Sequence, residues 1–147
     1  CRSRGIRVAT AESCTGGQIA GTLTEVAGSS DVFECSFVTY SNESKSKMLG
    51  VPLEFLQTFG AVSEEVAVSM AEGALARSRA NMAISVTGIA GPGGGNEFKP
   101  VGLVHMAIAL EGFETSHFFD VFPGDRIEIR TAAVDCALTR MASAISR

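Results

Sequence analysis

The amino-acid sequence predicts an α/β fold: a three-layer α/β/α sandwich with a mixed, mostly parallel sheet of about five strands. Short β-branched or alternating runs take turns with stretches whose apolar residues recur at helical spacing. The last two expected strands are joined at Glu111-Gly112, a pair typical of a hairpin turn. The 147 residues are 46% hydrophobic and 19% charged, so we expect a single domain over residues 1–147.

Apolar spacing and turn residues define the elements of the first half. Ile19, Leu23 and Val26 would fall on one face of a helix. Gly50 and Gly60 are placed to end two shorter helices. We therefore expect, in order, a strand over Ile6–Thr10, a helix from Thr15 to about Ala27, a strand over Phe33–Tyr40, a helix ending at Leu49 and a helix over Leu53–Phe59.

Capping and charged residues define the second half. Ser63 can cap a helix with Glu64 and Glu65 in its first turn, and we expect Arg77 and Arg79 in its last turn. The remaining expected elements are strands over Met82–Val86, Val101–Leu110 and Phe113–Phe122, a loop over Thr87–Gly102, and a final helix capped by Asp125 with Glu128 completing a capping box.

Charge, hydropathy and cysteine usage argue against several classes of function. A net charge of −4 without a long basic run argues against nucleic-acid binding. The longest uncharged stretch, Ala80–Asn96, contains Pro92 and five glycines, so no membrane span is expected. No signal peptide is evident, and a cytoplasmic protein is expected. The four cysteines lack Cys-x-x-Cys spacing and the only histidines lie twelve positions apart, which predicts neither a structural metal nor a disulfide framework.

The first group of candidate site residues lies where the first strand meets the first helix, in Thr10-Ala11-Glu12-Ser13-Cys14-Thr15-Gly16-Gly17. Ligands of open α/β sheets bind beyond the carboxyl ends of the strands. A hydroxyl here would face helix-start N–H groups, around Thr15–Gly17, that could stabilise an oxyanion. Gly16 and Gly17 would let a ligand approach the backbone. On this string alone, the alternative that Ser13 or Thr15 merely caps the helix is favoured, because capping is common.

The second group follows the second strand, in Tyr40-Ser41-Asn42-Glu43-Ser44-Lys45. A lysine can act as general base for a serine when burial lowers its pKa. No histidine lies near either serine in the sequence, so Lys45 is the natural base for a serine nucleophile. The alternative is a solvated lysine, which is the more common case and the one expected for Lys47.

The third group is a Gly-rich loop that runs from Thr87 through Gly88 and Gly91 to Lys99. Its N–H groups could bind a phosphate or carboxylate. The alternative is a mobile crossover loop without a ligand, and the two interpretations weigh about equally. At the start of the final helix, Arg126 could hold a phosphate.

Five strings occur in order across nearly the whole chain, and their combination is specific where each alone would be weak. They are Ala11-Glu12-Ser13-Cys14-Thr15-Gly16-Gly17, Phe37-Val38-Thr39-Tyr40-Ser41-Asn42, Gly60-Ala61-Val62-Ser63, Gly88-Ile89-Ala90-Gly91-Pro92 with Lys99-Pro100-Val101-Gly102, and Phe122-Pro123-Gly124-Asp125-Arg126. With these strings the chain resembles the CinA C-terminal domain family, whose enzymatic members are the PncC-type nicotinamide mononucleotide amidases. That family usually has a helix before the first strand, which we expect to be missing here.

The resemblance implies hydrolysis of the carboxamide of nicotinamide mononucleotide (NMN) to nicotinate mononucleotide and ammonia, in pyridine nucleotide salvage, with no metal and no cofactor. By position it implies Ser13 as nucleophile, Lys45 as general base and Tyr40 as a supporting residue. Cys14 is an alternative nucleophile that we rank below Ser13. The implied or candidate substrate-binding residues are Thr15, Gly16, Gly17, Thr87, Gly88, Gly91, Lys99 and Arg126.

Two other functions stay open at this point. A non-catalytic pyridine-nucleotide-binding module would be expected to have lost Ser13 or Lys45, and both are present. An interaction domain linked to competence or DNA damage is the other alternative, although the acidic composition gives DNA binding no support. The resemblance also implies a homo-oligomer, in which Arg126 could reach a neighbouring subunit's site.

Overall fold

A five-stranded mixed sheet of order β2-β1-β3-β4-β5 forms the middle layer of the computed structural model, which describes residues 1–146. The strands are β1 (Val8–Glu12), β2 (Phe33–Val38), β3 (Met82–Gly88), β4 (Leu103–Leu110) and β5 (Ser116–Val121). Strand β1 pairs parallel with β2 and β3, whereas β4 pairs antiparallel with β3 and β5. Strand β4 alone is reversed, which confirms the predicted mostly parallel sheet with one hairpin.

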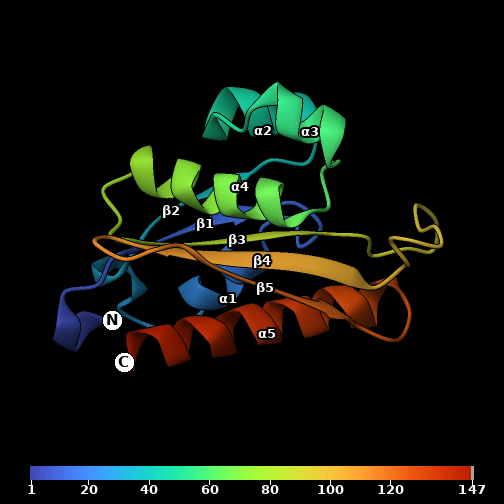
Figure 1. Cartoon of the computed structure of the whole chain (residues 1–147). Helices are drawn as coiled ribbons and strands as arrows, with labels where there is room; N and C mark the ends of the chain where they lie inside the picture. Colours follow the sequence, from blue (N-terminus) through green and yellow to red (C-terminus); the bar gives the residue numbers. More distant parts are fainter. Residues whose placement is uncertain (147) are drawn as a thin grey trace.

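Helices cover both faces of this sheet and complete the predicted sandwich (Figure 1). One face carries α2 (Asn42–Leu49), α3 (Leu53–Thr58) and α4 (Glu64–Ala76), and the other carries α1 (Gln18–Thr24) and α5 (Arg126–Ile145). Single turns of 3-10 helix, η1 (Arg2–Arg4) and η2 (Ser29–Asp31), precede β1 and β2. Within residues 1–146, no helix is long and apolar enough to span a membrane.

Several predicted element ends are wrong by a few residues. Helix α1 ends at Thr24 rather than near Ala27. Helix α4 ends at Ala76, so Arg77 is its C-cap and Arg79 lies beyond the helix rather than in its last turn. Strand β3 continues to Gly88, because its last residues still pair with β4. Strand β1 starts two residues later than predicted, at Val8, and β4 and β5 start at Leu103 and Ser116.

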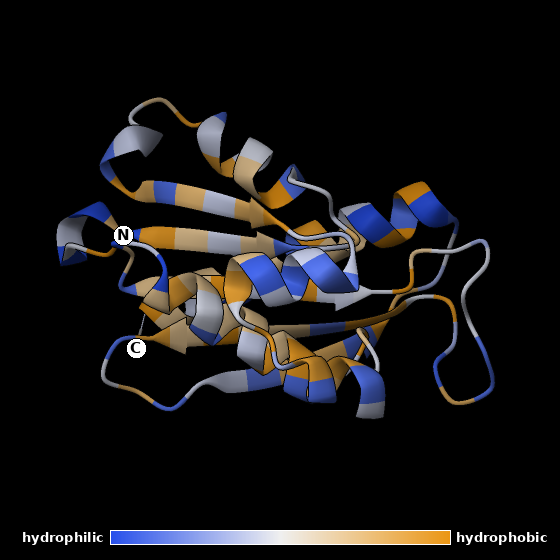
Figure 2. Ribbon diagram, turned by 90° about the horizontal axis from the view of Figure 1, so that it is seen from above, coloured by the Kyte–Doolittle hydropathy of each residue, from blue (hydrophilic) through white to orange (hydrophobic). Residues whose placement is uncertain are grey.

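Alternation along β1 directs its side chains to two separate apolar cores. Val8 packs with Ile84 and Ile129 on the α5 side, whereas Ala9 packs with Leu49 and other residues on the α4 side. Hydrophobic residues are concentrated in the strands at the centre of the molecule (Figure 2). Burial of each large apolar side chain contributes about 1.5–3 kcal/mol, so the cores hold the strand ends in register.

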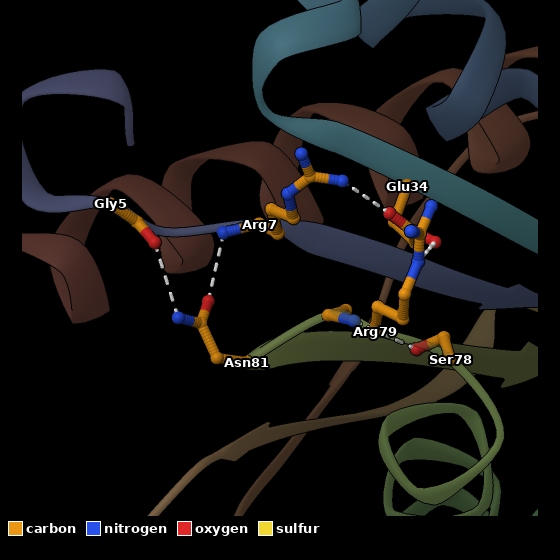
Figure 3. Close-up of polar contacts among 7 residues, drawn as sticks. Gly5, Arg7, Glu34, Ser78, Arg79 and Asn81 are labelled. Carbon is orange, nitrogen blue, oxygen red and sulfur yellow. Dashed lines mark hydrogen bonds and ion pairs between the residues drawn. The ribbon is translucent and has the colours of Figure 1, made fainter.

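The amino edge of the sheet is joined by a polar cluster (Figure 3). Glu34 accepts hydrogen bonds from Arg7 Nη1 at 2.7 Å and from Arg79 Nε at 3.0 Å. The Asn81 side chain accepts from the Arg7 N–H at 2.8 Å and donates to the Gly5 carbonyl at 3.2 Å. The cluster therefore links the starts of β1, β2 and β3 through paired charges and satisfied amides.

Candidate active site

A cavity of about 280 Å³ lies at the opposite edge, beyond the carboxyl ends of β1 and β3. Among its lining are Cys14 and seven of the predicted site residues: Ser13, Tyr40, Lys45, Thr87, Gly88, Gly91 and Arg126. The other predicted site residues, Thr15, Gly16, Gly17 and Lys99, are not part of this lining. The folded chain thus brings four segments that are distant in the sequence to one hollow.

Ser13 and Lys45 meet because of strand alternation and a helix cap. Ser13 continues the alternation of Ala9 and Ala11, which places its side chain on the side of the sheet covered by α2. Its N–H donates to the Val86 carbonyl at 2.9 Å, which extends the pairing of β1 with β3. Helix α2 begins at a Ser41 cap, whose Oγ accepts from the Ser44 N–H at 3.0 Å. Lys45 Nζ then lies 3.1 Å from Ser13 Oγ.

The environment of Lys45 favours its neutral form. Its side chain is buried, with 1% of the residue exposed, and burial lowers its pKa to about 8. Its other hydrogen bonds go to main-chain carbonyls, those of Thr39 at 2.8 Å and Tyr40 at 3.4 Å. A neutral amine has two N–H donors and one lone pair. With both donors bound to carbonyls, the lone pair is available to the Ser13 hydroxyl.

Cys14 lines the same cavity but is poorly suited to be the nucleophile. Burial raises the pKa of its thiol to about 11, although the backbone N–H of Cys14 itself and the charges of Arg130 and Lys45 act in the opposite direction. The thiolate is the nucleophilic form, and a thiol with this pKa is protonated at neutral pH. The ranking of Ser13 above Cys14 therefore has a physical basis in the structure.

Glu12 is a buried acidic residue that the sequence analysis did not single out. Its carboxylate accepts from Thr15 Oγ1 at 2.7 Å and from the N–H groups of Gly17, Ile19 and Ala20 at 3.0, 3.1 and 2.9 Å. It therefore caps the start of α1. An acidic residue on the last strand position before a Gly-Gly helix start was the available signal, because alternation directs it to the α1 side.

This cap changes which N–H groups could stabilise an oxyanion. The Gly17 N–H donates to Glu12, and the Gly16 N–H donates to the Ser13 carbonyl at 3.0 Å. Among residues 1–146, the N–H groups of Cys14 and Thr15 have no protein acceptor. Of the donors predicted around Thr15–Gly17, only that of Thr15 is thus open, and the Cys14 N–H joins it.

Arg130, from α5, is the second residue that the sequence analysis missed. Its Nε donates to the Cys14 carbonyl at 3.0 Å and its Nη2 donates to the Thr15 carbonyl at 3.3 Å. Gly16 beside this guanidinium has a φ of +58°, so the backbone conformation of the turn favours glycine at this position. No sequence pattern marks Arg130, which sits within a long helix far along the chain from Ser13.

The rim of the cavity is held by Arg126 and its partners. Arg126 Nη1 donates to the Gly91 carbonyl at 2.7 Å and Nη2 donates to the Tyr40 hydroxyl at 3.1 Å. Thr87 is buried, and its hydroxyl donates to the Ala61 carbonyl at 2.8 Å. Lys99 Nζ is instead bound to the Phe59 carbonyl, outside the cavity lining.

Metal ligands are not clustered in the part of the chain that the structure describes. Over residues 1–146, no group of three or more His, Cys, Asp or Glu side chains is placed to hold a metal ion. The absence of a cofactor stays a prediction from the sequence.

The fold and this edge define an α/β protein with a buried Ser–Lys pair facing a cavity. The chain belongs to the CinA C-terminal domain family, whose sequence model matches residues 1–145. It is 53% identical over 137 residues to nicotinamide-nucleotide amidohydrolase PncC of Escherichia coli strain K12, covering 93% of this chain and 83% of that protein. It is 54% identical over 138 residues to a CinA-like protein of Chlorobium phaeobacteroides, covering 91% of this chain.

The relatives differ in length. The chain spans about a third of the CinA-like relatives, 33% for the protein of Chlorobium phaeobacteroides. Among solved structures, the competence/damage inducible protein CihA from Agrobacterium tumefaciens superposes with a TM-score of 0.95 at 54% identity, over 99% of this chain and 88% of that one. Membership of the family is therefore supported along the whole domain.

Proposed function

We propose that this chain is an amidohydrolase that converts NMN to nicotinate mononucleotide and ammonia by a Ser–Lys mechanism. The observation that carries the proposal is the 3.1 Å approach of Ser13 Oγ to Lys45 Nζ, a lysine whose pKa burial lowers to about 8. The identity of 53% to a protein named nicotinamide-nucleotide amidohydrolase supplies the substrate class. From the family resemblance we also propose a role in pyridine nucleotide salvage, and a cytoplasmic homo-oligomer.

The reaction divides into two steps. Neutral Lys45 takes the proton of the Ser13 hydroxyl as Oγ attacks the carboxamide carbon. The resulting ammonium of Lys45 returns that proton to the amide nitrogen as the C–N bond breaks, and ammonia leaves. A water then attacks the acyl-serine with Lys45 again as base, releasing the carboxylate product and the Ser13 hydroxyl.

The tetrahedral intermediate needs donors for its oxyanion. The open N–H groups of Cys14 and Thr15 follow the nucleophile in the chain, and Cys14 lines the cavity beside Ser13. An N–H of the residue after the nucleophile serves this purpose in other serine hydrolases. We assign the oxyanion to these two groups, rather than to the N–H groups of Gly16 and Gly17, which already have protein acceptors.

The 5′-phosphate of the substrate is best matched by Arg126. Its guanidinium lines the cavity and is held by two neutral oxygens, those of Gly91 and Tyr40. In the part of the chain that the structure describes, no carboxylate is bound to it. A planar guanidinium suits a phosphate. Lys99, the alternative, lies outside the cavity lining. Tyr40, with 62% of its surface exposed, would support Arg126 and face the substrate.

The test is ammonia release from NMN with EDTA present, comparing wild type, Ser13→Ala and Lys45→Ala. Lys47→Ala is the matched control, because Lys47 lies on the same helix and its ammonium pairs with Glu43 in solvent. Activity that disappears in the first two variants and persists in the control supports the proposal. Activity that survives Ser13→Ala would refute the nucleophile. A folded wild type that binds NMN without hydrolysing it would favour the pyridine-nucleotide-binding module.

A further inference from the structure

The turn after Ser13 has an unusual distribution of hydrogen bonds. Its carbonyl groups at Cys14 and Thr15 are bound by Arg130, and its N–H groups at Gly16 and Gly17 are bound by protein oxygens. Two N–H groups, those of Cys14 and Thr15, lack a protein acceptor among residues 1–146. The open donors are therefore adjacent to the nucleophile, and the rest of the turn is fixed.

Each open N–H ends a hydrogen-bond chain that starts at Arg130. In the first chain, Arg130 Nε donates to the Cys14 carbonyl, and that peptide unit carries the Thr15 N–H. In the second, Arg130 Nη2 donates to the Thr15 carbonyl, whose peptide unit carries the Gly16 N–H. The Gly16 N–H donates to the Ser13 carbonyl, and that peptide unit carries the Cys14 N–H.

Chains of this kind strengthen their terminal donors. A charged donor on a carbonyl polarises the peptide unit, so that its N–H becomes a better donor, and successive bonds reinforce one another. Both peptide planes are also held in orientation, because rotation would break the bonds to the guanidinium. The effect is largest when the acceptor carries developing negative charge.

The setting of Arg130 argues for more than a structural role. The guanidinium is half-buried, and within residues 1–146 it forms no salt bridge with a carboxylate. Its hydrogen bonds go to the two carbonyls of this turn. A half-buried charge without a counter-ion is costly to maintain, so a purely structural role would be better filled by a neutral donor.

We propose that Arg130 is a positioning residue for amide hydrolysis, which polarises and orients the Cys14 and Thr15 N–H groups toward the oxyanion. The inference rests on the proposed amidohydrolase function. It assigns Arg130 a contribution that appears in the transition state and not in the binding of the uncharged carboxamide.

The experiment compares NMN hydrolysis by wild type, Arg130→Met and Arg130→Lys across pH, with Tm recorded for each. Arg140→Met is the matched control, since Arg140 lies on the same helix with its guanidinium 4.8 Å from the Phe118 ring, away from the site. We expect kcat of Arg130→Met to fall about 10- to 100-fold, less than the roughly 10²–10³-fold for removing an oxyanion donor, because the N–H groups remain. Arg130→Lys should recover part of this loss, because it keeps the charge.

The measurements separate the possible outcomes. Support requires that kcat falls while KM stays within about twofold and the acid limb of the pH profile does not move, since a transition-state interaction changes kcat alone. A kcat within twofold of wild type in a folded variant would overturn the inference. So would a loss accompanied by a raised KM and a displaced acid limb, the pattern of a disordered site. If Arg130→Met does not fold, Arg130→Gln, which also removes the charge, decides by the same criteria. A wild type inactive on NMN instead overturns the proposed function.

Discussion

The two edges of the sheet differ in how their charged residues are paired and buried. At the amino edge, Glu34 is paired with two arginines, Arg7 and Arg79, that are largely exposed to solvent. At the carboxyl edge, Lys45 is buried against Ser13 and main-chain carbonyls, and no carboxylate among residues 1–146 pairs with its amine.

The pKa values of Glu34 and Lys45 are both lowered, but this favours the charged form of Glu34 and the neutral form of Lys45. The hydrogen bonds from Arg7 and then Arg79 lower the pKa of Glu34, which favours its charged form. Burial lowers the pKa of Lys45, which disfavours its charged form. The first edge uses charge to join strands, whereas the second brings the pKa of a buried amine closer to neutral pH at a cost in stability.

The largest effect should follow from removing the nucleophile. Ser13→Ala is expected to lower kcat about 10⁴-fold or more, because the proton relay and the acyl-enzyme are both lost. Cys14→Ala should retain activity within a few-fold, since the buried thiol is protonated. Steady-state ammonia release measures both. Equal losses of activity in Ser13→Ala and Cys14→Ala would contradict the assignment of Ser13 rather than Cys14 as the nucleophile.

The pH profile tests whether the lysine really works as a neutral base. Only the unprotonated amine can accept the Ser13 proton, so kcat/KM should rise about tenfold per pH unit below about 8 and level off above it. A profile that is flat from pH 6 to 9 would contradict this role for Lys45. The Glu34→Gln variant is the control, and its profile should coincide with that of wild type.

The next largest effect on kinetics is expected from replacing the residue that binds the substrate's phosphate. Arg126→Gln should raise KM for NMN about tenfold or more with a smaller change in kcat, because a charge-assisted phosphate contact is lost. The same variant should leave KM for nicotinamide riboside, which lacks the phosphate, close to the wild-type value. Lys99→Gln is the comparison variant. If it raises KM more than Arg126→Gln does, Lys99 rather than Arg126 binds the phosphate.

Replacing Lys45 at the carboxyl edge should increase stability while it removes activity. Lys45→Met is expected to raise the free energy of unfolding at pH 7 by about 1–2 kcal/mol, because a buried charge is replaced by an apolar side chain of similar length. The unfolded lysine binds its proton up to about pH 10.5 and the folded one only to about pH 8. The free energy of unfolding of wild type should therefore rise between about pH 8 and pH 10.5 and approach that of Lys45→Met. Urea unfolding at pH 7 and pH 10 measures it, and a variant less stable at pH 7 would contradict the account.

The sequence predicts the layers of the fold better than the contacts within the candidate site. Alternating strands and capped helices identified the layers and the hairpin, because those signals are local. Residue types alone made Lys45 the candidate base for a serine, but its pairing with Ser13 in particular was expected from the family resemblance, since 32 positions separate the two residues. Glu12 and Arg130 escaped notice for different reasons. Strand alternation could have directed Glu12 toward α1, whereas the contact of Arg130 depends on how α5 packs, 116 positions away from Cys14.

The smallest effect belongs to the paired charges at the amino edge. Glu34→Gln should lower Tm only slightly at pH 7, since ion pairs whose arginines are open to solvent contribute little, and should leave kcat and KM unchanged. The sign with pH follows from the lowered pKa of Glu34, because its contribution is present above the ordinary value of 4.5 and is lost as pH falls through the folded value. The Tm difference from wild type should therefore vanish in acid and shrink in high salt. A difference that persists under both conditions would mean that Glu34 packs the strand ends rather than pairing with Arg7 and Arg79, and the two edges would then differ in burial alone.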